Sequence, residues 1–442
     1  MTLPKILIFG QPFHRHSGGG ITLSNLFEGW DKDKIAVACT GHMLTNVETD
    51  ICEKYYQLGN KDHRWVFPFN KFQYNFPSGV LTVKPAEFKN TPMQKISVRK
   101  KLVDKIFFPV LKFIGVYYKL SSIKLSNEFK EWLSHYNPDV LYAQVSDRDA
   151  IVFVQKLHAF LKKPMIIHVM DDWPSTISSS GPFKRYWRKK IDYEFRDLVN
   201  KSSFLFTISD RMASEYKKRY NKDCITFHNP INLEFWEKYQ KNIYDLNKSP
   251  SLLYAGRIGI AIEESLKTIA ESIAIINKEL DISMKFVLQT QEMLPWLNKY
   301  SFVIHQPFVK YNELPKKFSE VDFLILPYDF SDDSITFIKY SMPTKAPEYM
   351  ICGTPILVFA PAETAIVDYA TKFNWAKVIT KNSSSELATS IKSLIISKGE
   401  RETLAFNAKN LAKKNHDSKV VVDHFRQRIC SLTNENYFSN NI

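Results

Sequence analysis

The sequence has 442 residues, of which 44% are hydrophobic and 24% are charged, with a formal net charge of +14 at pH 7. This composition excludes a disordered or low-complexity chain, and the length exceeds what one hydrophobic core usually serves, so we expect two domains. The positive charge points to an anionic partner: a phosphorylated substrate, a nucleic acid or an anionic membrane surface. The five cysteines are scattered without metal-ligand spacing, which indicates reduced thiols in the cytoplasm.

The first apolar run, Lys5–Gly10, is too short for a signal peptide and is typical of a first strand. No stretch of the sequence reaches the ~18 uninterrupted apolar residues that a membrane-spanning helix needs. These features predict a soluble or peripheral protein.

A glycine-rich loop, Ser17–Gly20, follows this first strand and precedes the helical pattern Ile21–Phe27. Glycines let the backbone approach a phosphate closely, and a helix N-terminus favours its negative charge. The loop is not GxGxxG and has no P-loop lysine, which argues against dinucleotide binding and nucleotide hydrolysis. The alternative interpretation is a flexible turn.

The segment Arg99–Leu120 is rich in aromatic residues, and Lys105, Lys112 and Lys119 recur every seven residues. On a helix these lysines form one basic line along an apolar cylinder. Such a helix suits a membrane interface, where its lysines would meet anionic head groups. The alternative is a core helix kinked at Pro109, whose lysines reach solvent.

Strand Pro164–Met170 ends in two carboxylates, Asp171 and Asp172. Charged residues at the carboxyl end of a strand are placed for chemistry, and paired carboxylates raise one pKa. A helix N-cap is the alternative role for these aspartates. His168, inside the same apolar run, is either a core histidine or a catalyst.

Strands and helices alternate through the rest of the chain, which predicts parallel sheets in α/β domains. The polar stretch Glu237–Pro250 indicates a linker, after which strand Ser251–Ala255 leads to Gly256 and Arg257. The further helices that we expect are Ser126–Tyr136, Asp149–Leu161, Arg185–Asn200, Arg211–Tyr220, Glu263–Asn277, Asn312–Glu320, Ser385–Ser397, Arg401–Lys414 and Val420–Leu432. The further strands are Ser203–Ser209, Met284–Gln289, Phe302–His305 and Val321–Pro327, and an acidic loop is expected over Tyr328–Asp333.

The stretch Ser341–Pro361 combines a helix start with a buried strand, Ile356–Ala360. Gly353 and Pro355 stop the helix before the strand begins. A helix start beside the carboxyl edge of a parallel sheet is an anion-binding position. The polar residues at this helix start are Ser341, Thr344, Lys345 and Glu348.

Taken in order, these motifs resemble those of retaining nucleotide-sugar glycosyltransferases of the GT-B fold, in particular the group 1 or family 4 type that builds bacterial polysaccharides. The matching segments are Ser17–Gly20, Asn229–Asn232, Tyr254–Arg257 and Lys345–Pro355. The resemblance implies an α/β chain with two Rossmann-like domains whose parallel sheets face each other across a cleft. The implied boundaries are an acceptor-binding domain over residues 1–238, a linker over 239–250, a nucleotide-sugar-binding domain over 251–414, and a C-terminal helix and tail over 415–442 that return to the first domain.

The resemblance also assigns roles to single residues. The donor diphosphate would be bound by Gly18, Gly19, Arg257, Ser341, Thr344 and Lys345, and the ribose by Glu348. The acceptor-side catalytic edge would contain His168, Asp171 and Asp172. The resemblance implies no metal, and it implies no cofactor because the nucleoside-diphosphate sugar is a substrate. Two departures stand out: Ile258–Ile262 occupies the place of the family's second phosphate-binding lysine, which Lys345 would replace, and Tyr340 stands where the family has the first of two glutamates.

The implied activity is transfer of a hexose from a nucleoside-diphosphate sugar to an acceptor hydroxyl, with retention and without metal, in cell-surface polysaccharide or glycolipid synthesis. The partners would be the nucleotide sugar, a carbohydrate or lipid-linked acceptor and an anionic membrane surface bound through residues 99–120. Nucleic acid is not expected, since the basic residues are spread through both halves of the chain. The expected location is cytoplasmic, peripheral at the inner face of the plasma membrane. The alternatives are a GT-B sugar-nucleotide epimerase and a non-catalytic basic α/β binding protein.

Overall fold

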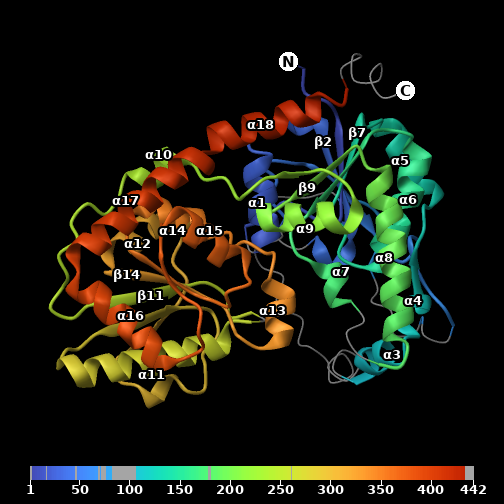
Figure 1. Ribbon diagram of the computed structural model, residues 1–442. Helices are drawn as coiled ribbons and strands as arrows, with labels where there is room; N and C mark the ends of the chain where they lie inside the picture. The colour runs from blue at the N-terminus through green and yellow to red at the C-terminus, as the bar shows by residue number, and fades with distance from the viewer. Residues whose placement is uncertain are drawn as a thin grey trace. The chain divides into compact units, whose positions relative to one another are not determined.

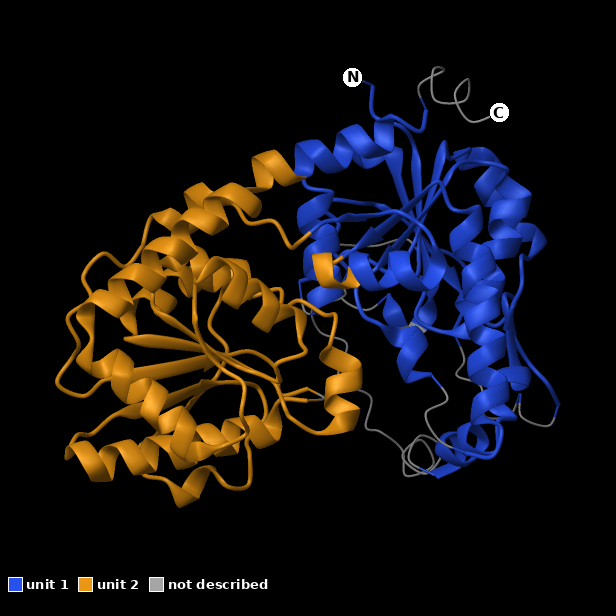
Figure 2. Cartoon of the chain, viewed as in Figure 1, with its two compact units in different colours: residues 1–207, 213–227, 422–442 blue, residues 208–212, 228–421 orange. Residues whose placement is uncertain are grey.

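The computed structural model describes residues 2–15, 17–44, 47–67, 70, 76–81, 106–177, 181–259 and 261–433 (Figure 1). The chain divides into two compact units, coloured separately in Figure 2. Unit 1 comprises residues 1–207, 213–227 and 422–442, and unit 2 comprises residues 208–212 and 228–421. The segment 239–250, which we expected to be a linker, therefore lies within unit 2.

Within the described residues of unit 1, eight strands form one sheet in the order β10-β9-β8-β7-β1-β2-β3-β5. All neighbours pair in parallel except β3 and β5. The strands are β1 (Ile6–Phe9), β2 (Ile35–Thr40), β3 (Lys54–Leu58), β5 (Gly79–Leu81), β7 (Val140–Ala143), β8 (Met165–Val169), β9 (Phe204–Thr207) and β10 (Cys224–Thr226), and a separate antiparallel pair joins β4 (His63–Trp65) to β6 (Ser121–Ile123).

Helices connect these strands, as the alternating pattern of the sequence predicts. They are α1 (Gly18–Leu26), α3 (Phe108–Phe113), α4 (Tyr117–Leu120), α5 (Asn127–Tyr136), α6 (Arg148–Leu161), α7 (Trp173–Thr176) and α8 (Lys184–Lys201), with α9 (Asp210–Tyr220) and α18 (Ser418–Cys430) each divided between the units. The strand order reverses between β1 and β7, and open α/β sheets bind ligands beyond the carboxyl ends of the strands at such a point. The residues that follow β1 therefore stand at the ligand-binding edge of unit 1.

In the described part of unit 2, six parallel strands follow the order β13-β12-β11-β14-β15-β16. Numbered from the first strand of the unit, this is the 3-2-1-4-5-6 order of dinucleotide-binding folds, with its reversal between β11 and β14. The strands are β11 (Ser251–Ala255), β12 (Lys285–Gln289), β13 (Val303–Gln306), β14 (Phe323–Pro327), β15 (Ile356–Phe359) and β16 (Lys377–Ile379). The helices are α10 (Leu233–Glu237), α11 (Glu263–Leu280), α12 (Leu314–Glu320), α13 (Asp332–Ile338), α14 (Ala346–Cys352), α15 (Ala365–Phe373), α16 (Ser384–Ile396) and α17 (Lys398–Asn415).

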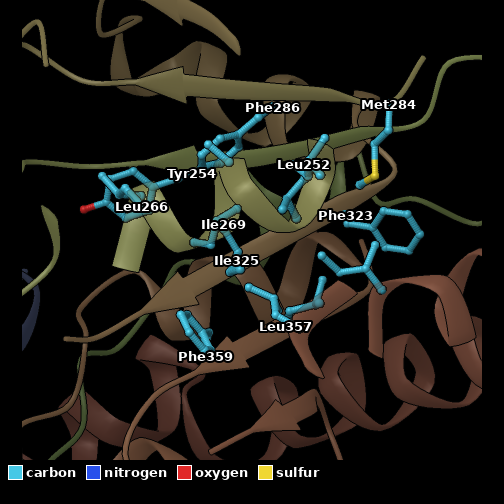
Figure 3. Packing of buried hydrophobic residues seen from close by; sticks show 14 of the residues in the cluster. Leu252, Tyr254, Leu266, Ile269, Met284, Phe286, Phe323, Ile325, Leu357 and Phe359 are labelled. Carbon is cyan, nitrogen blue, oxygen red and sulfur yellow. The ribbon is translucent and has the colours of Figure 1, made fainter. Parts of the chain in front are cut away.

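The core of unit 2 lies between its sheet and two helices that pack against each other, α11 and α16. Leu252 and Tyr254 of β11, Phe286 of β12 and Ile325 of β14 pack against Ile269 of α11 (Figure 3). These strands are apolar along their whole length because helices cover parallel sheets on both faces. Each fully buried large side chain of this kind contributes about 1.5–3 kcal/mol.

We predicted one continuous helix over Arg99–Leu120. Residues 99–105 lie outside the described residues, and for residues 106–120 the prediction is wrong. Residues 106–120 form two short helices, α3 and α4, separated by a turn at Gly115, which has a φ of +70°. The basic line of one continuous helix is therefore absent. Lys112 instead lies 5.0 Å from the centre of the Tyr117 ring across the turn.

Three smaller differences concern element boundaries in the two units. Helix α1 begins at Gly18 rather than at Ile21, because Ser17 caps it. The acidic segment that we expected to be a loop contains the start of α13 at Asp332, capped by Ser331. Strands β2, β3 and β16 and helix α15 are among the elements that were not predicted. None of the helices in the described ranges has the length and apolar character that a membrane crossing requires.

We predict that Gly353→Ala lowers the free energy of unfolding by about 1–2 kcal/mol. Gly353 ends α14 at a φ of +78°, and a β-carbon there would lie 2.9 Å from the carbonyl oxygen of Lys241. The matched control is Gly399→Ala near the start of α17, where an added β-carbon meets no atom within 4 Å. Urea unfolding followed by circular dichroism measures both, and a Gly353→Ala variant as stable as the control would contradict the prediction.

Candidate functional site

The carboxyl end of β11 is the point of unit 2 where a ligand is expected, because the strand order reverses beside it. Gly256 and Arg257 follow β11 directly, and Arg257 is exposed. Arg257 therefore stands at the sheet edge, and a guanidinium favours bidentate contact with phosphate.

Lys345, which precedes α14, reaches this same strand end. Its Nζ donates a hydrogen bond of 2.7 Å to the carbonyl oxygen of Ala255 and lies 4.4 Å from the centre of the Tyr254 ring. The Tyr254 hydroxyl donates to the carbonyl oxygen of Arg257 at 2.6 Å, which fixes the turn that carries the arginine. Among the described residues neither cation has a carboxylate within 4.0 Å. Two basic residues thus stand at one strand end, and neither forms an ion pair within the described part of the chain.

Glu348 lies three residues after Lys345, within α14, and only 8% of its surface is exposed. Burial raises the pKa of Glu348 to about 7, although Lys345 and a hydrogen bond with the Tyr311 side chain oppose the shift. Burial likewise lowers the pKa of Lys345 to about 8, against the opposing effect of Glu348. Two shifted groups of opposite sign at a strand end are typical of a functional site, because the protein alone does not stabilise their charges.

The hydroxyl residues Ser341 and Thr344 lie in the turn before α14 and so beside Lys345. Ser341 is buried, and its Oγ lies 3.5 Å from the carbonyl oxygen of Phe337. The carbonyl oxygen of Thr344 accepts a hydrogen bond of 2.9 Å from the side-chain amide of Asn229. This contact shows how the motif that begins at Asn229 serves the site: it holds the turn in place.

The two predicted glycines belong to unit 1. Gly18 and Gly19 form the first turn of α1, where backbone N–H groups have no acceptor within the helix. The hydroxyl of Ser17 accepts from the amide of Gly20 at 3.4 Å and so fixes the helix start. A β-carbon on Gly19 would lie 3.2 Å from the Gln11 side chain, so the helix start packs closely on the segment after β1.

His168 lies in the centre of β8 and is 1% exposed. Its ring contacts the rings of Tyr142 and Phe206, and its Nδ1 shares a hydrogen bond with the Tyr142 hydroxyl. Burial lowers the pKa of His168 to about 3, so the ring is neutral at physiological pH. These surroundings are those of a core histidine, and the catalytic role of His168 stays a prediction.

The two aspartates after β8 have different surroundings. Asp172 is 1% exposed and accepts hydrogen bonds from Tyr216, Ser175 and Arg219 at 2.9, 2.6 and 3.0 Å. Burial raises the pKa of Asp172 although these partners favour the charged form. Asp171, in contrast, is exposed at the strand end. The geometry favours a structural role for Asp172 and leaves Asp171 as the accessible carboxylate.

The ten predicted site residues therefore fall into two groups. Unit 2 brings together Arg257, Ser341, Thr344, Lys345 and Glu348, and unit 1 holds Gly18, Gly19, His168, Asp171 and Asp172. The sequence interpretation missed Tyr311, the partner of Glu348, for which no local signal exists because 37 residues separate the two. The role of Tyr254 was signalled by its place in the motif Tyr254–Arg257.

One of the acidic residues after β14, Asp329, caps a helix. Asp329 accepts a hydrogen bond of 2.8 Å from the amide of Ser265 at the start of α11. Tyr340, in the position expected for a glutamate, is buried, and its carbonyl oxygen accepts from the Ser209 hydroxyl at 2.6 Å. No three His, Cys, Asp or Glu side chains gather into a potential metal site in the described ranges.

Comparison with known structures identifies the fold. Anabaena HepE, solved in complex with UDP-glucose, is 14% identical and aligns over 97% of this chain and 100% of its own at a TM-score of 0.58. Sucrose-phosphate synthase from Thermosynechococcus elongatus is 11% identical over 97% of this chain and 98% of its own at 0.59. WaaG, a glycosyltransferase involved in lipopolysaccharide biosynthesis, is 12% identical over 96% of this chain and 99% of its own at 0.58.

These structures are GT-B glycosyltransferases, and the likeness confirms the predicted GT-B fold. Comparison with models of known protein families gives no match, and neither does comparison with curated protein sequences. At such low identity the likeness extends to the fold alone, so the chemistry rests on the residues described above.

We predict that Glu348→Gln stabilises the ligand-free protein by about 2 kcal/mol at pH 8 and has little effect at pH 4. With a folded pKa of about 7 against an ordinary value of 4.5, the folded state holds an extra proton between these pH values. Stability from this group is therefore complete below pH 4.5 and is lost as the pH rises through 7. Thermal unfolding across this range tests it, with the exposed Glu363→Gln as control; equal curves for both variants would contradict the prediction.

We predict that Asp172→Ala lowers the free energy of unfolding by about 3 kcal/mol, because it removes the buried acceptor of hydrogen bonds from Tyr216, Ser175 and Arg219. Asp171→Ala, at the exposed neighbouring position, is expected to change stability by less than about 0.5 kcal/mol. Chemical denaturation of the two variants under one condition measures the difference. Similar unfolding midpoints would show that Asp172 has no structural role.

Proposed function

We propose that this chain is a glycosyltransferase that moves a hexose from a nucleoside-diphosphate sugar to an acceptor hydroxyl. The observation that carries the proposal is the position of Lys345, whose ammonium lies on the Ala255 carbonyl beside Arg257 without a carboxylate partner among the described residues. A donor diphosphate would supply the missing negative charge. The GT-B fold supports this interpretation by analogy, and the contacts of Lys345 support it independently.

The buried carboxylate of Glu348 suits the other end of a nucleotide. A carboxylate accepts hydrogen bonds from two neighbouring hydroxyls, so Glu348 would bind the ribose. The raised pKa of about 7 shows that Lys345 and Tyr311 stabilise the negative charge of Glu348 only in part. Hydrogen bonds from the ribose hydroxyls would stabilise that charge further. HepE was solved with UDP-glucose, which supports a nucleoside-diphosphate hexose as the donor class.

In the proposed reaction the bond between the anomeric carbon and the diphosphate oxygen breaks, and a bond to the acceptor oxygen forms. Negative charge develops on the leaving diphosphate, where Arg257, Lys345 and the hydroxyls of Ser341 and Thr344, all in unit 2, would stabilise it. The acceptor hydroxyl gives up its proton to a carboxylate, for which Asp171 is our candidate because it is the exposed acid at the end of β8. Retention of configuration and independence from metal are part of the proposal and come from the resemblance.

We further propose that the acceptor belongs to cell-surface polysaccharide or glycolipid synthesis. WaaG, which acts in lipopolysaccharide biosynthesis, supports this class of acceptor. A lipid-linked acceptor would place the reaction in the cytoplasm at the inner face of the plasma membrane, with the nucleotide sugar and the acceptor as partners.

Two other functions remain open to direct tests. A sugar-nucleotide epimerase would return an epimerised donor, which chromatography of the reaction products detects. A non-catalytic binding protein would bind nucleoside diphosphates but would not cleave a nucleotide sugar to release one. Release of nucleoside diphosphate from UDP-glucose or a related donor, with product analysis, separates the three functions.

We predict that Lys345→Ala and Glu348→Ala each lower donor turnover by about 10²–10³ and weaken nucleoside diphosphate binding. The controls are the exposed Lys372→Ala and Glu363→Ala, which remove the same charges from unit 2 away from β11. Calorimetry with UDP and with other nucleoside diphosphates measures binding, and release of the diphosphate measures turnover. Near-normal values for both site variants would refute the site assignment.

A further inference from the structure

Two basic segments of unit 1 lie side by side, although more than sixty residues separate them in the sequence. The turn after α3 packs on the start of α8: a β-carbon on Gly115 would lie 2.7 Å from the Trp187 indole nitrogen and 3.0 Å from the Phe183 β-carbon. The rings of Tyr118 and Trp187 lie 4.9 Å apart. Figure 1 shows α3 beside one end of α8. Residues 106–120 and 181–190 therefore share one surface.

The strand end after β4 joins this surface. The Trp65 ring lies 5.5 Å from that of Phe108, and the amide of Val66 donates to the carbonyl oxygen of Leu120 at 2.8 Å. We call residues 65–67, 106–120 and 181–190 together the basic aromatic surface.

Large apolar side chains are exposed across the basic aromatic surface. Phe67, Phe113 and Phe183 are 74%, 53% and 56% exposed, far more than a buried core position allows. The other exposed members are Val66, Ile106, Val110, Ile114, Val116 and Tyr186. A contiguous apolar patch on a folded chain marks an interaction site, whereas single exposed apolar residues do not.

The charge of the same surface has one sign. Residues 106–120 contain Lys112 and Lys119, and residues 181–190 contain Lys184, Arg185, Arg188, Lys189 and Lys190, while neither segment contains Asp or Glu. Except for Lys190, which is partly buried against the Tyr186 and Trp187 rings, these basic residues are exposed. Seven cations with no acid among them surround the exposed aromatic side chains.

We infer that the basic aromatic surface docks unit 1 onto an anionic phospholipid membrane. Apolar and aromatic side chains enter the interface between head groups and acyl chains, and lysine and arginine contact the lipid phosphates around them. A second copy of the chain fits poorly, because a symmetric contact would place seven cations against seven. A nucleic acid would use the cations but would leave aliphatic residues such as Val110 and Ile114 without a role.

This surface is not the single basic helix that the sequence predicts over residues 99–120. The contribution of α8 comes from a segment far along the chain, and no continuous helix carries the lysines. The docking itself does not depend on the proposed function. Its value for catalysis does rest on that function: if the chain transfers sugar, docking through unit 1 brings the enzyme to acceptors that reside in the membrane.

The test is flotation of the full chain with vesicles of phosphatidylcholine alone or mixed with phosphatidylglycerol, at low and high salt. We expect binding to the mixed vesicles at low salt and little binding to phosphatidylcholine. Lys184→Glu/Arg185→Glu/Lys189→Glu should weaken binding at least ~100-fold, since each cation near an anionic surface contributes about fivefold. Phe113→Ser/Phe183→Ser should retain weak binding that high salt abolishes, because only the screened electrostatic part remains.

The matched controls lie in unit 2: Lys267→Glu/Lys278→Glu/Lys299→Glu for charge, and Met293→Ser/Ile396→Ser for exposed apolar residues. Both should bind like the wild type, and all variants should keep the wild-type unfolding temperature and UDP binding. Absence of binding to mixed vesicles at low salt overturns the inference, as does equal weakening by the control set. Dimerisation that the phenylalanine variant abolishes, without vesicle binding, would assign the surface to a second copy instead. Failure to bind UDP or any other nucleoside diphosphate would refute the proposed function and leave the membrane inference standing.

Discussion

The hydrogen bond from Lys345 to the Ala255 carbonyl ties the candidate donor site to the sheet of unit 2. A lysine ammonium needs several acceptors when it leaves water, and here it receives a carbonyl oxygen and the face of the Tyr254 ring. Ala255 is in register with Gln289 of β12, and its amide donates a hydrogen bond of 3.0 Å to the Tyr349 hydroxyl of α14, so this carbonyl is held by the sheet and by the helix. The sheet thus fixes a charge in place before any ligand arrives, which is the preorganisation that stabilising a diphosphate requires.

The contrast between Asp172 and Glu348 shows how the two units use buried carboxylates. Asp172 is surrounded by the Arg219 guanidinium and by hydroxyl donors, so its charge is compensated within the fold. Glu348 has a hydrogen bond with Tyr311 and an ammonium three residues away, yet its pKa still rises to about 7. A carboxylate whose partners suffice supports the structure, and one whose partners do not suffice is available to a ligand.

The sequence predicted most of the fold because apolar runs, glycines and prolines act locally. Strand β11, its Gly256–Arg257 turn and the helix ending at Gly353 were all predicted from neighbouring residues alone. The prediction failed where contacts between distant residues determine the secondary structure. Helices α3 and α4 separate at Gly115, which packs against Trp187 of another helix. The candidate site was proposed from its charged residues, and their roles stay a prediction. The contacts of Tyr311 and of the Asn229 side chain span 37 and 115 residues, which no local pattern encodes.

Helix α18 gives unit 1 a discontinuous core. Phe425 packs against Phe27, Phe206 and Phe227, with ring centres 5.1 to 5.8 Å apart, so the last helix completes a core that the first two hundred residues begin. During synthesis, an N-terminal unit usually folds as soon as its residues have emerged from the ribosome. The core of unit 1 is complete only once residue 425 has emerged, and by then all residues of unit 2 have been synthesised. The later unit can therefore finish folding first, while the Phe27 and Phe206 side chains still await the aromatic ring that covers them.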